Sequence, residues 1–433
     1  MSTVCVIGSG YVGLTTAACF AHVGHTVVCT DIDEARIARL NGGECPILEQ
    51  GLDNLLREGL AGGRLRFVAG NAAAAEAEFV YLCVPTPQGA DGSADLSFIE
   101  AAAAEIGPIL APDTVVINKS TVPVGSTRVV ERVLGRSDVH VVSNPEFLRE
   151  GTAVHDFLNP DRIVIGADDQ SAAVRVASLY LGIAAPLIVT DPASAETIKY
   201  AANAFLATKI SFANAVAAVC EAVGADIGDV VLGMGYDRRI GSEFLRPGPG
   251  WGGSCFPKDS RALVHIAETA GYDFGLLKGV ITVNDEQFER VAAKVVDAAG
   301  GSVEGVKVAA WGLTFKARTD DLRDSPALAI IDRLRAAGAR VVAYDPSIEE
   351  GGVPAGDKRA ALLDGIEVAA DPYAACEGAE ALVVLTEWDE FRWLDFDKVA
   401  EVMAGKRVVD ARNLLDREAL RRRGFSYAGV GRV

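Results

Sequence analysis

Near its start the chain reads Val4-Cys5-Val6-Ile7-Gly8-Ser9-Gly10-Tyr11-Val12-Gly13. The four apolar residues predict a buried strand, and apolar residues at helical spacing over 14–23, closed by Gly24, predict a helix. Between them lies a Gly-x-Gly-x-x-Gly turn. Its first glycine permits the bend, its second lets the backbone approach a pyrophosphate at the helix N-terminus, and its third allows close packing of helix on strand. The stretch therefore predicts a dinucleotide-binding, Rossmann-like domain.

The next predicted strand, residues 26–30, ends in Asp31. A carboxylate at this place meets the hydroxyl groups of an adenosine ribose, and it would repel the extra phosphate of NADP. A tight turn without a ligand is the plainer alternative. Strand, glycine turn, helix and acid nevertheless follow one another in the order that a dinucleotide site requires, so we expect NAD as the cofactor.

Three further apolar runs, residues 79–84, 114–118 and 139–142, also predict strands. They run respectively into Pro85-Thr86-Pro87, into Lys119-Ser120-Thr121-Val122-Pro123-Val124-Gly125 and into Ser143-Asn144-Pro145-Glu146-Phe147-Leu148-Arg149-Glu150-Gly151. Ligands of open parallel sheets bind beyond the carboxyl ends of the strands, so we expect these segments to face the same crevice as the glycine turn. If the third segment is helical, Glu146 and Glu150 share one face and could act together on a water or a proton; a solvated acidic face is the alternative.

The middle of the chain contains an alanine-rich stretch, residues 194–223, without glycine or proline. It predicts a long helix that serves as a connecting spine. Lys199 and Asn203 lie four residues apart and therefore on one face of this helix. They form either part of a site or a polar face on which the lysine reaches solvent.

Residues 247–259 contain four glycines and three prolines around Cys255. This composition predicts irregular backbone rather than a regular helix, shaped to approach a ligand closely. As a thiolate Cys255 would be a nucleophile, and Lys258 could lower its pKa if the fold brings the ammonium group close. The alternative is a small buried hydrophobic side chain beside a turn.

Beyond Gly300-Gly301-Ser302 the chain repeats the pattern of its beginning, with predicted strands at 306–311, 340–344, 381–385 and 407–410 and a helix at 326–337. The second strand of this set ends in Asp345. No Gly-x-Gly-x-x-Gly occurs here; instead, residues 312–323 carry Lys316, Arg318 and Arg323. We therefore predict an α/β protein with two Rossmann-like, doubly wound domains, residues 1–193 and 300–433, joined by a long central helix and a helical core, residues 194–299. The second Rossmann-like domain is expected to hold an anionic nucleotide.

Composition limits the classes of partner. The chain has 433 residues, half of them hydrophobic, and a net charge of −18, which disfavours nucleic acid as a partner. No basic leader and no run near the roughly 18 apolar residues of a membrane span are evident, so we expect a cytoplasmic protein without membrane contact. The eight cysteines and five histidines show no metal-ligand spacing, and neither a metal nor a disulfide is expected.

Six motifs in this order resemble the nucleotide-sugar dehydrogenases, and within them the UDP-glucose 6-dehydrogenase branch. They are Gly8 to Gly13, Ser120-Thr121-Val122-Pro123-Val124-Gly125, Asn144-Pro145-Glu146-Phe147-Leu148, Lys199-Tyr200-Ala201-Ala202-Asn203, Gly252-Gly253-Ser254-Cys255-Phe256-Pro257-Lys258-Asp259 and Phe315-Lys316 through Arg323. The segment Tyr236-Asp237-Arg238-Arg239-Ile240-Gly241 is similar to the UDP-glucose branch. Ala317-Arg318 departs from the Pro-Asn or similar pair that is common after Phe-Lys in the family.

The resemblance implies an NAD-dependent double oxidation of UDP-glucose to UDP-glucuronate, through a thiohemiacetal and a thioester on Cys255. It also implies at least a homodimer, in which Arg239 reaches the sugar of the neighbouring subunit. The implied catalytic residues are Cys255, Lys199, Asn203, Asp259, Thr121 and Glu146. The implied cofactor contacts are Gly8, Gly10, Tyr11, Val12, Gly13, Asp31, Arg36, Thr86, Thr121, Glu150, Lys258 and Arg323. The implied substrate contacts are Glu146, Phe147, Leu148, Lys199, Asn203, Arg239, Phe244, Gly252, Phe315, Lys316 and Arg412.

Three alternatives stay open at this point. The same chemistry could act on GDP-mannose or on a UDP-N-acetylhexosamine. A single-step NAD-dependent hydroxyacid dehydrogenase, with a structural Cys255, would share the two-domain plan. A catalytically silent nucleotide-sugar sensor would bind both ligands without turnover; the Cys255, Lys258, Asp259 group and the Lys199, Asn203 pair argue against it.

Overall fold

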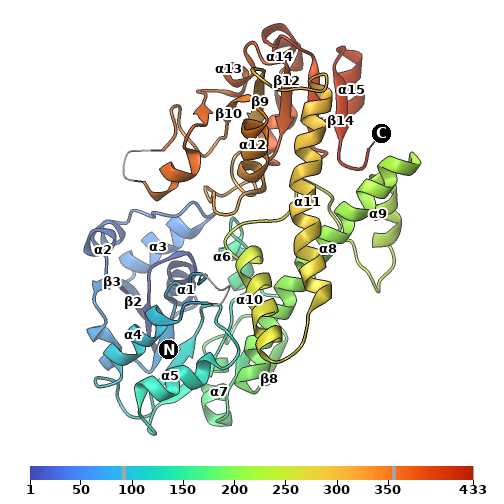
Figure 1. Cartoon of the computed structure of the whole chain (residues 1–433). Helices are drawn as coiled ribbons and strands as arrows, with labels where there is room; N and C mark the ends of the chain where they lie inside the picture. The colour runs from blue at the N-terminus through green and yellow to red at the C-terminus, as the bar shows by residue number, and fades with distance from the viewer. Residues whose placement is uncertain (90–93, 354–356, 433) are drawn as a thin grey trace. The chain divides into compact units, whose positions relative to one another are not determined.

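The computed structural model describes residues 1–89, 94–353 and 357–432 (Figure 1). It contains two compact units. Unit 1 comprises Met1–Ala202 and Arg261–Tyr272, and unit 2 comprises Asn203–Ser260 and Asp273–Val433. Each unit is built on one sheet covered by helices, which confirms the predicted fold class.

The sheet of unit 1 has eight strands in the order β3-β2-β1-β4-β5-β6-β7-β8. The strands are β1 (Thr3–Ile7), β2 (Thr26–Asp31), β3 (Leu65–Ala69), β4 (Phe79–Leu82), β5 (Val115–Asn118), β6 (His140–Ser143), β7 (Ile163–Gly166) and β8 (Leu187–Thr190). All neighbouring strands are parallel except β6 and β7. The first six therefore have the doubly wound order, in which the carboxyl ends of β1, β4, β5 and β6 meet at one edge.

Alternate residues of these strands enter two different cores. In β1, Val4 and Val6 belong to the core beneath α1 (Tyr11–His22), α3 (Leu52–Ala61), α6 (Ala153–Leu158) and α7 (Gln170–Ser178). Cys5 and Ile7 face the opposite core, beneath α4 (Ser97–Ile106), α5 (Ser126–Leu134) and the 3-10 helix η1 (Ala72–Glu76). Helices cover both faces of this sheet, so both sets of alternate side chains in a strand are buried. For this reason the strands appear in the sequence as continuous apolar runs.

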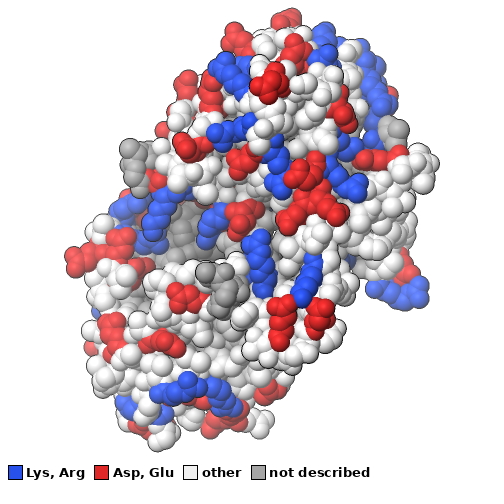
Figure 2. Space-filling model, viewed as in Figure 1, with Lys and Arg blue, Asp and Glu red and all other residues white. Residues whose placement is uncertain are grey.

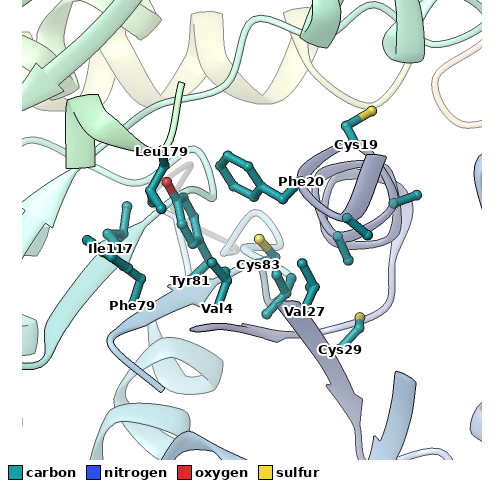
Figure 3. Packing of buried hydrophobic residues seen from close by; sticks show 14 of the residues in the cluster. Val4, Cys19, Phe20, Val27, Cys29, Phe79, Tyr81, Cys83, Ile117 and Leu179 are labelled. Atoms are coloured by element: carbon teal, nitrogen blue, oxygen red, sulfur yellow. The ribbon is translucent and has the colours of Figure 1, made fainter. Parts of the chain in front are cut away.

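Aromatic and aliphatic side chains pack together in the first of these cores (Figure 3). Phe20 on α1 lies 5.2 Å from Tyr81 on β4, measured between ring centroids, and 5.1 Å from Phe157 on α6. Each such buried ring stabilises the fold by roughly 1.5–3 kcal/mol. This packing fixes α1, and with it the glycine turn, on the sheet.

The sheet of unit 2 is parallel throughout and has six strands in the order β11-β10-β9-β12-β13-β14. The strands are β9 (Lys307–Trp311), β10 (Arg340–Tyr344), β11 (Glu367–Val368), β12 (Ala381–Val384), β13 (Arg407–Asp410) and β14 (Ser426–Gly429). One face packs against α11 (Gly275–Ala298) and α12 (Pro326–Ala336). The other packs against α13 (Pro372–Cys376), α14 (Phe396–Val402) and α15 (Arg417–Arg422).

The remaining described helices are α2 (Glu34–Asn41), α8 (Pro192–Val223), α9 (Ile227–Gly235), α10 (Phe256–Thr269) and the 3-10 helices η2 (Lys358–Leu363) and η3 (Asp389–Trp393). The predicted connecting helix over 194–223 is thus confirmed as α8, the long green helix in Figure 1. By length and composition α8 could cross a membrane, with a mean hydropathy of 1.4 over its most apolar window, a test that long core helices also pass. Its apolar residues are interrupted by Asn203, Lys209, Asn214 and Glu221, so α8 contains no continuous apolar run of about 18 residues, as expected from the sequence.

Two local features differ from the patterns in the sequence. Residues 144–149 form no helix, so the condition under which Glu146 and Glu150 would share a helix face is not met. The segment around Cys255 is irregular only up to that residue, because α10 begins at Phe256 and Pro257 stands in its first turn. Proline is tolerated there, since the first amide groups of a helix have no partner within it.

Candidate active site

The glycine turn of unit 1 has three different steric environments. Gly8 has φ +100°, and a Cβ there would lie 2.6 Å from the carbonyl oxygen of Cys83. A Cβ on Gly13 would lie 1.9 Å from the carbonyl oxygen of Gly8. A Cβ on Gly10 would meet nothing within 4 Å, although Gly10 stands at the N-terminus of α1. Only Gly10 therefore faces open space, where the positive end of the helix favours an anionic group.

Asp31, the last residue of β2, is bound to this turn. Its Oδ2 accepts hydrogen bonds from the backbone N of Ser9 at 2.9 Å and from the Oγ of Ser9 at 2.6 Å. Burial acts to raise the pKa of Asp31, but these bonds outweigh it and hold the pKa below its usual value. The carboxylate is ionised at neutral pH and would repel a 2′-phosphate. Arg36 on α2 lies close by, with Nη1 3.4 Å from the carbonyl oxygen of Ser9.

The segments after β4 and β5 are joined to one another. Thr86 donates from Oγ1 to the carbonyl oxygen of Thr121 at 2.9 Å. Glu196 on α8 accepts from the N of Gly125, at 2.6 Å, and from the N and Oγ1 of Thr127, at 2.9 and 2.7 Å. Burial raises the pKa of Glu196. Its carboxylate supplies the acceptors that the first turn of α5 lacks, and so fixes the loop that carries Thr121.

Glu146 and Lys199 form a buried ion pair within unit 1. Lys199 Nζ lies 2.8 Å from Glu146 Oε1, and the two side chains are 4% and 5% exposed. Glu146 Oε2 accepts from the backbone N of Leu148 at 2.6 Å. The ring of Phe147 lies near two cations, with its centroid 5.5 Å from Lys199 Nζ and 3.6 Å from the guanidinium carbon of Arg162. The segment after β6 thus presents a carboxylate and an ammonium group in fixed positions.

Tyr11, in the first turn of α1, contacts this same segment. Its hydroxyl donates to Glu49 Oε2 and accepts from the backbone N of Gly151 at 2.9 Å. Burial, followed by the hydrogen bond to Glu49, raises the pKa of Tyr11, so the phenol keeps its proton. Glu150 precedes Gly151 directly and, by its negative charge, also acts on Tyr11.

In unit 2, Cys255 directly precedes the first residue of α10 and is half-buried. The backbone N of Asp259 donates to the carbonyl oxygen of Cys255 at 2.8 Å. A helix N-terminus favours negative charge, which suits a thiolate. Cys5 and Cys83, by contrast, are buried in the sheet, and burial raises the pKa of each to about 12. Those two thiols are structural.

Asp259 lies on the first turn of α10 and is fully buried. Its Oδ2 accepts from Asn203 Nδ2 at 2.6 Å, and its Oδ1 forms an ion pair with Lys258 Nζ at 2.9 Å. Lys258 therefore neutralises Asp259. Asn203, Lys258 and Asp259 are brought together here, and Lys258 and Asp259 follow Cys255 by three and four residues in the sequence.

The glycines before Cys255 pack against the segment that follows β9. A Cβ on Gly252 would lie 1.9 Å from the carbonyl oxygen of Asp324, and one on Gly253 would lie 2.8 Å from the ring of Phe315. Arg412 donates from Nη2 to the carbonyl oxygen of Phe315 at 3.0 Å. Close packing therefore requires both glycines, Gly252 because it lies against the backbone of Asp324 and Gly253 because it lies against the ring of Phe315.

Among the other predicted residues of unit 2, Lys316 and Phe244 are half-buried, and Arg323 and Arg239 are exposed. Lys316 stacks near Phe315, at 5.4 Å from the ring centroid. Arg323 forms an ion pair with Asp321 at 2.7 Å. Arg239 is largely exposed and pairs with Asp237 at 2.6 Å. Phe244, at φ +63°, lies with its ring 6.3 Å from that of Phe256. Nothing in unit 2 brings Arg239 to Phe315 or Arg412 by a described contact.

Two buried carboxylates hold the loops of the second sheet. Asp345 follows β10, as the expected second acid, but it is fully buried, and Oδ2 accepts from the N atoms of Leu313 and Thr314 at 2.7 and 3.1 Å. Its Oδ1 accepts from the N and Oγ of Ser347 at 2.9 and 2.7 Å. Asp410, which ends β13, accepts from the N of Arg412 at 3.1 Å. Burial raises the pKa of Asp410.

Sequence reasoning did not single out Glu49, Glu196 or the hydrogen bonds of Asp345. Each of these carboxylates accepts from backbone N–H groups far away in the sequence. The only local signal was weak: each is an acid within or beside an apolar stretch. Such acids need buried donors, which only the fold reveals.

Of the two cavities described below, only one is lined by predicted site residues. One of about 120 Å³ in unit 1 is lined by Glu146, Phe147 and Leu148, and also by Lys119 and Arg162. Another of about 300 Å³ in unit 2 is lined by residues of η3 and α15, and by none of the predicted site residues. Among the residues that the structure describes, no group of three or more His, Cys, Asp or Glu side chains could hold a metal ion.

Family models match three consecutive parts of the chain. Residues 2–184 match the NAD binding domain of the UDP-glucose/GDP-mannose dehydrogenase family, residues 193–286 its central domain, and residues 309–417 its UDP binding domain. The first match contains the glycine turn, Asp31 and Glu146. The second contains Cys255, and the third contains Phe315 and Arg412.

Curated relatives match along almost the whole chain. A UDP-glucose 6-dehydrogenase from Rhizobium meliloti is 48% identical over 441 residues, with 99% of each chain covered. One from Pseudomonas aeruginosa is 46% identical, covering 99% of this chain and 97% of that protein. Among solved structures, a UDP-glucose dehydrogenase from Pyrobaculum islandicum is 38% identical with a TM-score of 0.89, covering 100% of this chain and 98% of that one. The chain belongs to the UDP-glucose/GDP-mannose dehydrogenase family.

Proposed function

We propose that this chain is an NAD-dependent UDP-glucose 6-dehydrogenase, which oxidises the C6 alcohol of UDP-glucose to the carboxylate of UDP-glucuronate. The carrying observation is the arrangement at the start of α10, where Cys255 precedes a turn whose Asp259 is held by Asn203 and Lys258. Relatives named UDP-glucose 6-dehydrogenase, 40–48% identical over nearly the full length, support the substrate.

NAD supplies the chemistry of accepting hydride, once for each of the two oxidations. The open space at Gly10 and the N-terminus of α1 suit its pyrophosphate, and the ionised Asp31 suits its ribose. Tyr11, Thr86 and Glu150 lie at the same edge of the sheet and would line the remainder of the cofactor. The proposal adds Gly8, Val12, Gly13, Arg36, Thr121, Lys258 and Arg323 as contacts.

Cys255 makes the second oxidation possible. The first oxidation turns the alcohol into an aldehyde. The aldehyde is not itself a hydride donor, because loss of its hydride would not leave a stable product. Addition of the Cys255 thiolate to the carbonyl carbon yields a thiohemiacetal, whose C–H bond can be broken with loss of hydride to give a thioester. Water then displaces the sulfur, giving the carboxylate and regenerating the thiol. One alcohol and one water thus give one carboxylate, two hydrides and three protons.

The polar neighbours take the accompanying proton and charge transfers. Lys199 and Asn203, one turn apart on α8, are assigned to the oxygen of the substrate, which becomes an alkoxide in both tetrahedral stages. Glu146 forms an ion pair with Lys199 and is assigned as a proton acceptor. Asp259 and Thr121 are assigned to the hydrolytic water.

The substrate would contact one set of residues through its nucleoside diphosphate and another set through its sugar. Phe315, Lys316 and Arg412 lie in the part that matches the UDP binding domain, and they offer a ring, an ammonium group and a guanidinium group to a nucleoside diphosphate. Phe147, Leu148, Phe244 and Gly252 are assigned to the sugar side. Arg239, which is exposed on a loop, is assigned to the sugar of a neighbouring subunit.

The test is the number of NADH molecules released per UDP-glucose consumed, with the product identified. We expect a ratio of two for the wild type. Cys255→Ala should bind both ligands and form almost no acid, a loss of at least roughly 10⁴-fold. Cys255→Ser should accumulate an ester that is visible in the intact mass, because an ester reacts with water more slowly than a thioester. A wild-type ratio of one would instead favour a single-step dehydrogenase.

The choice of sugar has its own test. A structure of a UDP-D-ManNAc dehydrogenase from Pyrococcus horikoshii is also similar, with 28% identity and a TM-score of 0.87. A panel of UDP-glucose, GDP-mannose and a UDP-N-acetylhexosamine, followed by NADH absorbance, separates the branches. The proposal fails if either of the other two is turned over more efficiently than UDP-glucose.

The proposed enzyme is a cytoplasmic homodimer. The supporting observation is an apolar stripe on α8, where Phe205, Phe212 and Val219 lie seven residues apart and are 65%, 52% and 59% exposed. Exposed apolar side chains in a row are typical of an interface, and a second copy presents the same stripe. Phe212→Glu should yield a monomer in light scattering. Mixed dimers of Arg239→Ala with Cys255→Ala should recover part of the activity if the two residues serve one site from different chains.

The domain division over 1–193, 194–299 and 300–433 is likewise proposed. Its first part carries a sheet that is parallel except between β6 and β7, its last part carries a parallel sheet, and its middle part carries α8 to α11. Limited proteolysis would test it, since cleavage should concentrate near residues 193 and 300.

A further inference from the structure

Glu49 is a buried carboxylate that joins two functional segments of unit 1. It lies in the loop between α2 and α3 and is 6% exposed. Its Oε2 accepts from the hydroxyl of Tyr11 and from the backbone N of Gly151, the latter at 2.7 Å. Its Oε1 accepts from the backbone N of Ala153 at 2.9 Å.

The donors come from both sides of the proposed site. Tyr11 belongs to the cofactor turn, whereas Gly151 ends the segment that carries Glu146, Phe147 and Leu148. Within the described residues Glu49 has no ion pair with Lys, Arg or His, so these three donors replace the water that burial removes. Loss of any one of these three donors leaves the buried carboxylate of Glu49 with fewer hydrogen bonds to replace water.

The contact also involves Tyr11 directly. Its hydroxyl donates to Glu49 and, at the same time, accepts from Gly151 N at 2.9 Å. Gly151 N–H is therefore shared between the phenol and the carboxylate. Gly151 has φ +82°, a backbone conformation that residues other than glycine rarely adopt, so glycine allows the turn that brings this N–H to both acceptors. A shift of either segment breaks hydrogen bonds on the other.

We propose that Glu49 is a positioning residue, which holds the glycine turn and the segment after β6 together through Tyr11 and Gly151. Tyr11 then influences the affinity for the sugar nucleotide as well as the affinity for NAD. This inference rests on the proposed function, because it takes residues 146–148 to contact the sugar. The coupling is between two ligands and therefore acts in both directions.

Tyr11→Phe is the sharpest perturbation, since it removes one hydroxyl and keeps the ring. Isothermal titration of UDP-glucose into the NAD-free protein should show a dissociation constant raised by about fivefold or more. A residue that only touches the cofactor would leave this constant unchanged. Tyr373→Phe is the matched control, because its hydroxyl also accepts from a backbone N, that of Asp395 at 3.0 Å, and it lies in unit 2 outside every proposed contact.

A double-mutant cycle then tests whether Tyr11 acts through Glu49. Glu49→Gln keeps the size of the side chain and replaces one acceptor oxygen by a donor that faces an N–H group. If the two residues act as one, the double variant Tyr11→Phe/Glu49→Gln should bind UDP-glucose no more weakly than the weaker single variant. Thermal unfolding of each variant separates lost affinity from lost stability.

Two results overturn the inference. One is a UDP-glucose affinity of Tyr11→Phe equal to that of the wild type, with or without a loss of stability. The other is a double variant whose loss is the product of the two single losses, because independent action excludes positioning through Glu49. If the wild type itself fails to bind UDP-glucose, the proposed function falls, and this inference falls with it.

Discussion

Breaking the buried ion pair between Glu146 and Lys199 should destabilise unit 1 strongly. Both side chains are about 95% buried, and Lys199 Nζ lies 2.8 Å from Glu146 Oε1. Lys199→Met removes the cation and leaves Glu146 with the N–H of Leu148 as its one described hydrogen-bond donor. An uncompensated buried charge of this kind costs about 3–5 kcal/mol of unfolding free energy. In urea, at about 1–3 kcal/mol per molar, the midpoint should fall by at least 1 M.

A second variant isolates the pair from its surroundings. Glu146→Gln/Lys199→Met removes both charges and retains side chains of similar volume, so most of the lost stability should return. Its activity should not return, because both residues are assigned to catalysis. Hydrogen exchange of peptides covering 140–151, measured at increasing urea, reports on unit 1 alone and avoids treating the two units as one transition.

The reasoning would be refuted by either of two results. Lys199→Met could cost less than about 1 kcal/mol, which would mean that Glu146 is adequately solvated without the lysine. Alternatively, the double variant could lose the sum of the two single losses, which would mean that the residues stabilise the fold independently.

Three further outcomes are expected. Gly10→Ala should fold normally and weaken NAD binding by at least about tenfold, whereas Gly13→Ala should unfold readily, because its Cβ would overlap the backbone of Gly8; equal stability of the two would contradict this. Asp31→Asn should reduce the preference for NAD over NADP by roughly 100-fold in kcat/KM, and an unchanged ratio would show that the acid does not read the ribose. Burial raises the pKa of Glu196, so its contribution to stability is complete below the unfolded pKa of about 4.3 and is lost as pH rises through the higher folded value. Glu196→Gln should therefore gain in stability relative to the wild type from pH 4 to pH 7. A constant difference between the urea midpoints of the two proteins across this range would contradict this direction.

The strands and long helices were predictable because their sequence signals are local. Parallel strands covered on both faces read as continuous apolar runs, and glycine or proline marks their ends. Residues 340–344 and 407–410 form β10 and β13 within one residue of the expectation. The glycine turn, Asp31 and Cys255 were found from local motifs as well.

The segment after β6 could not be predicted in this way. A helix was considered over residues 143–151, but there the N–H groups bond to side chains instead of to carbonyl groups four residues earlier. Leu148 N binds Glu146, Arg149 N binds Asp156, and Gly151 N binds Glu49. These acceptors lie up to about a hundred residues away, and propensity contains no information on them.

The two sheets also show that equal topology does not mean equal ligands. Both contain the strand order that many dinucleotide-binding domains share, and in both an aspartate stands at the carboxyl end of the second strand, Asp31 as the last residue of β2 and Asp345 directly after β10. Oδ1 of Asp31 makes its hydrogen bond at an exposed position. Asp345, by contrast, is buried, and both of its oxygens accept from neighbouring loops. A cofactor search by strand order would count two nucleotide-cofactor sites in this chain. Grafting a glycine-rich loop onto the second sheet would not create another one, because its aspartate would first have to be released from the loop that it now holds closed.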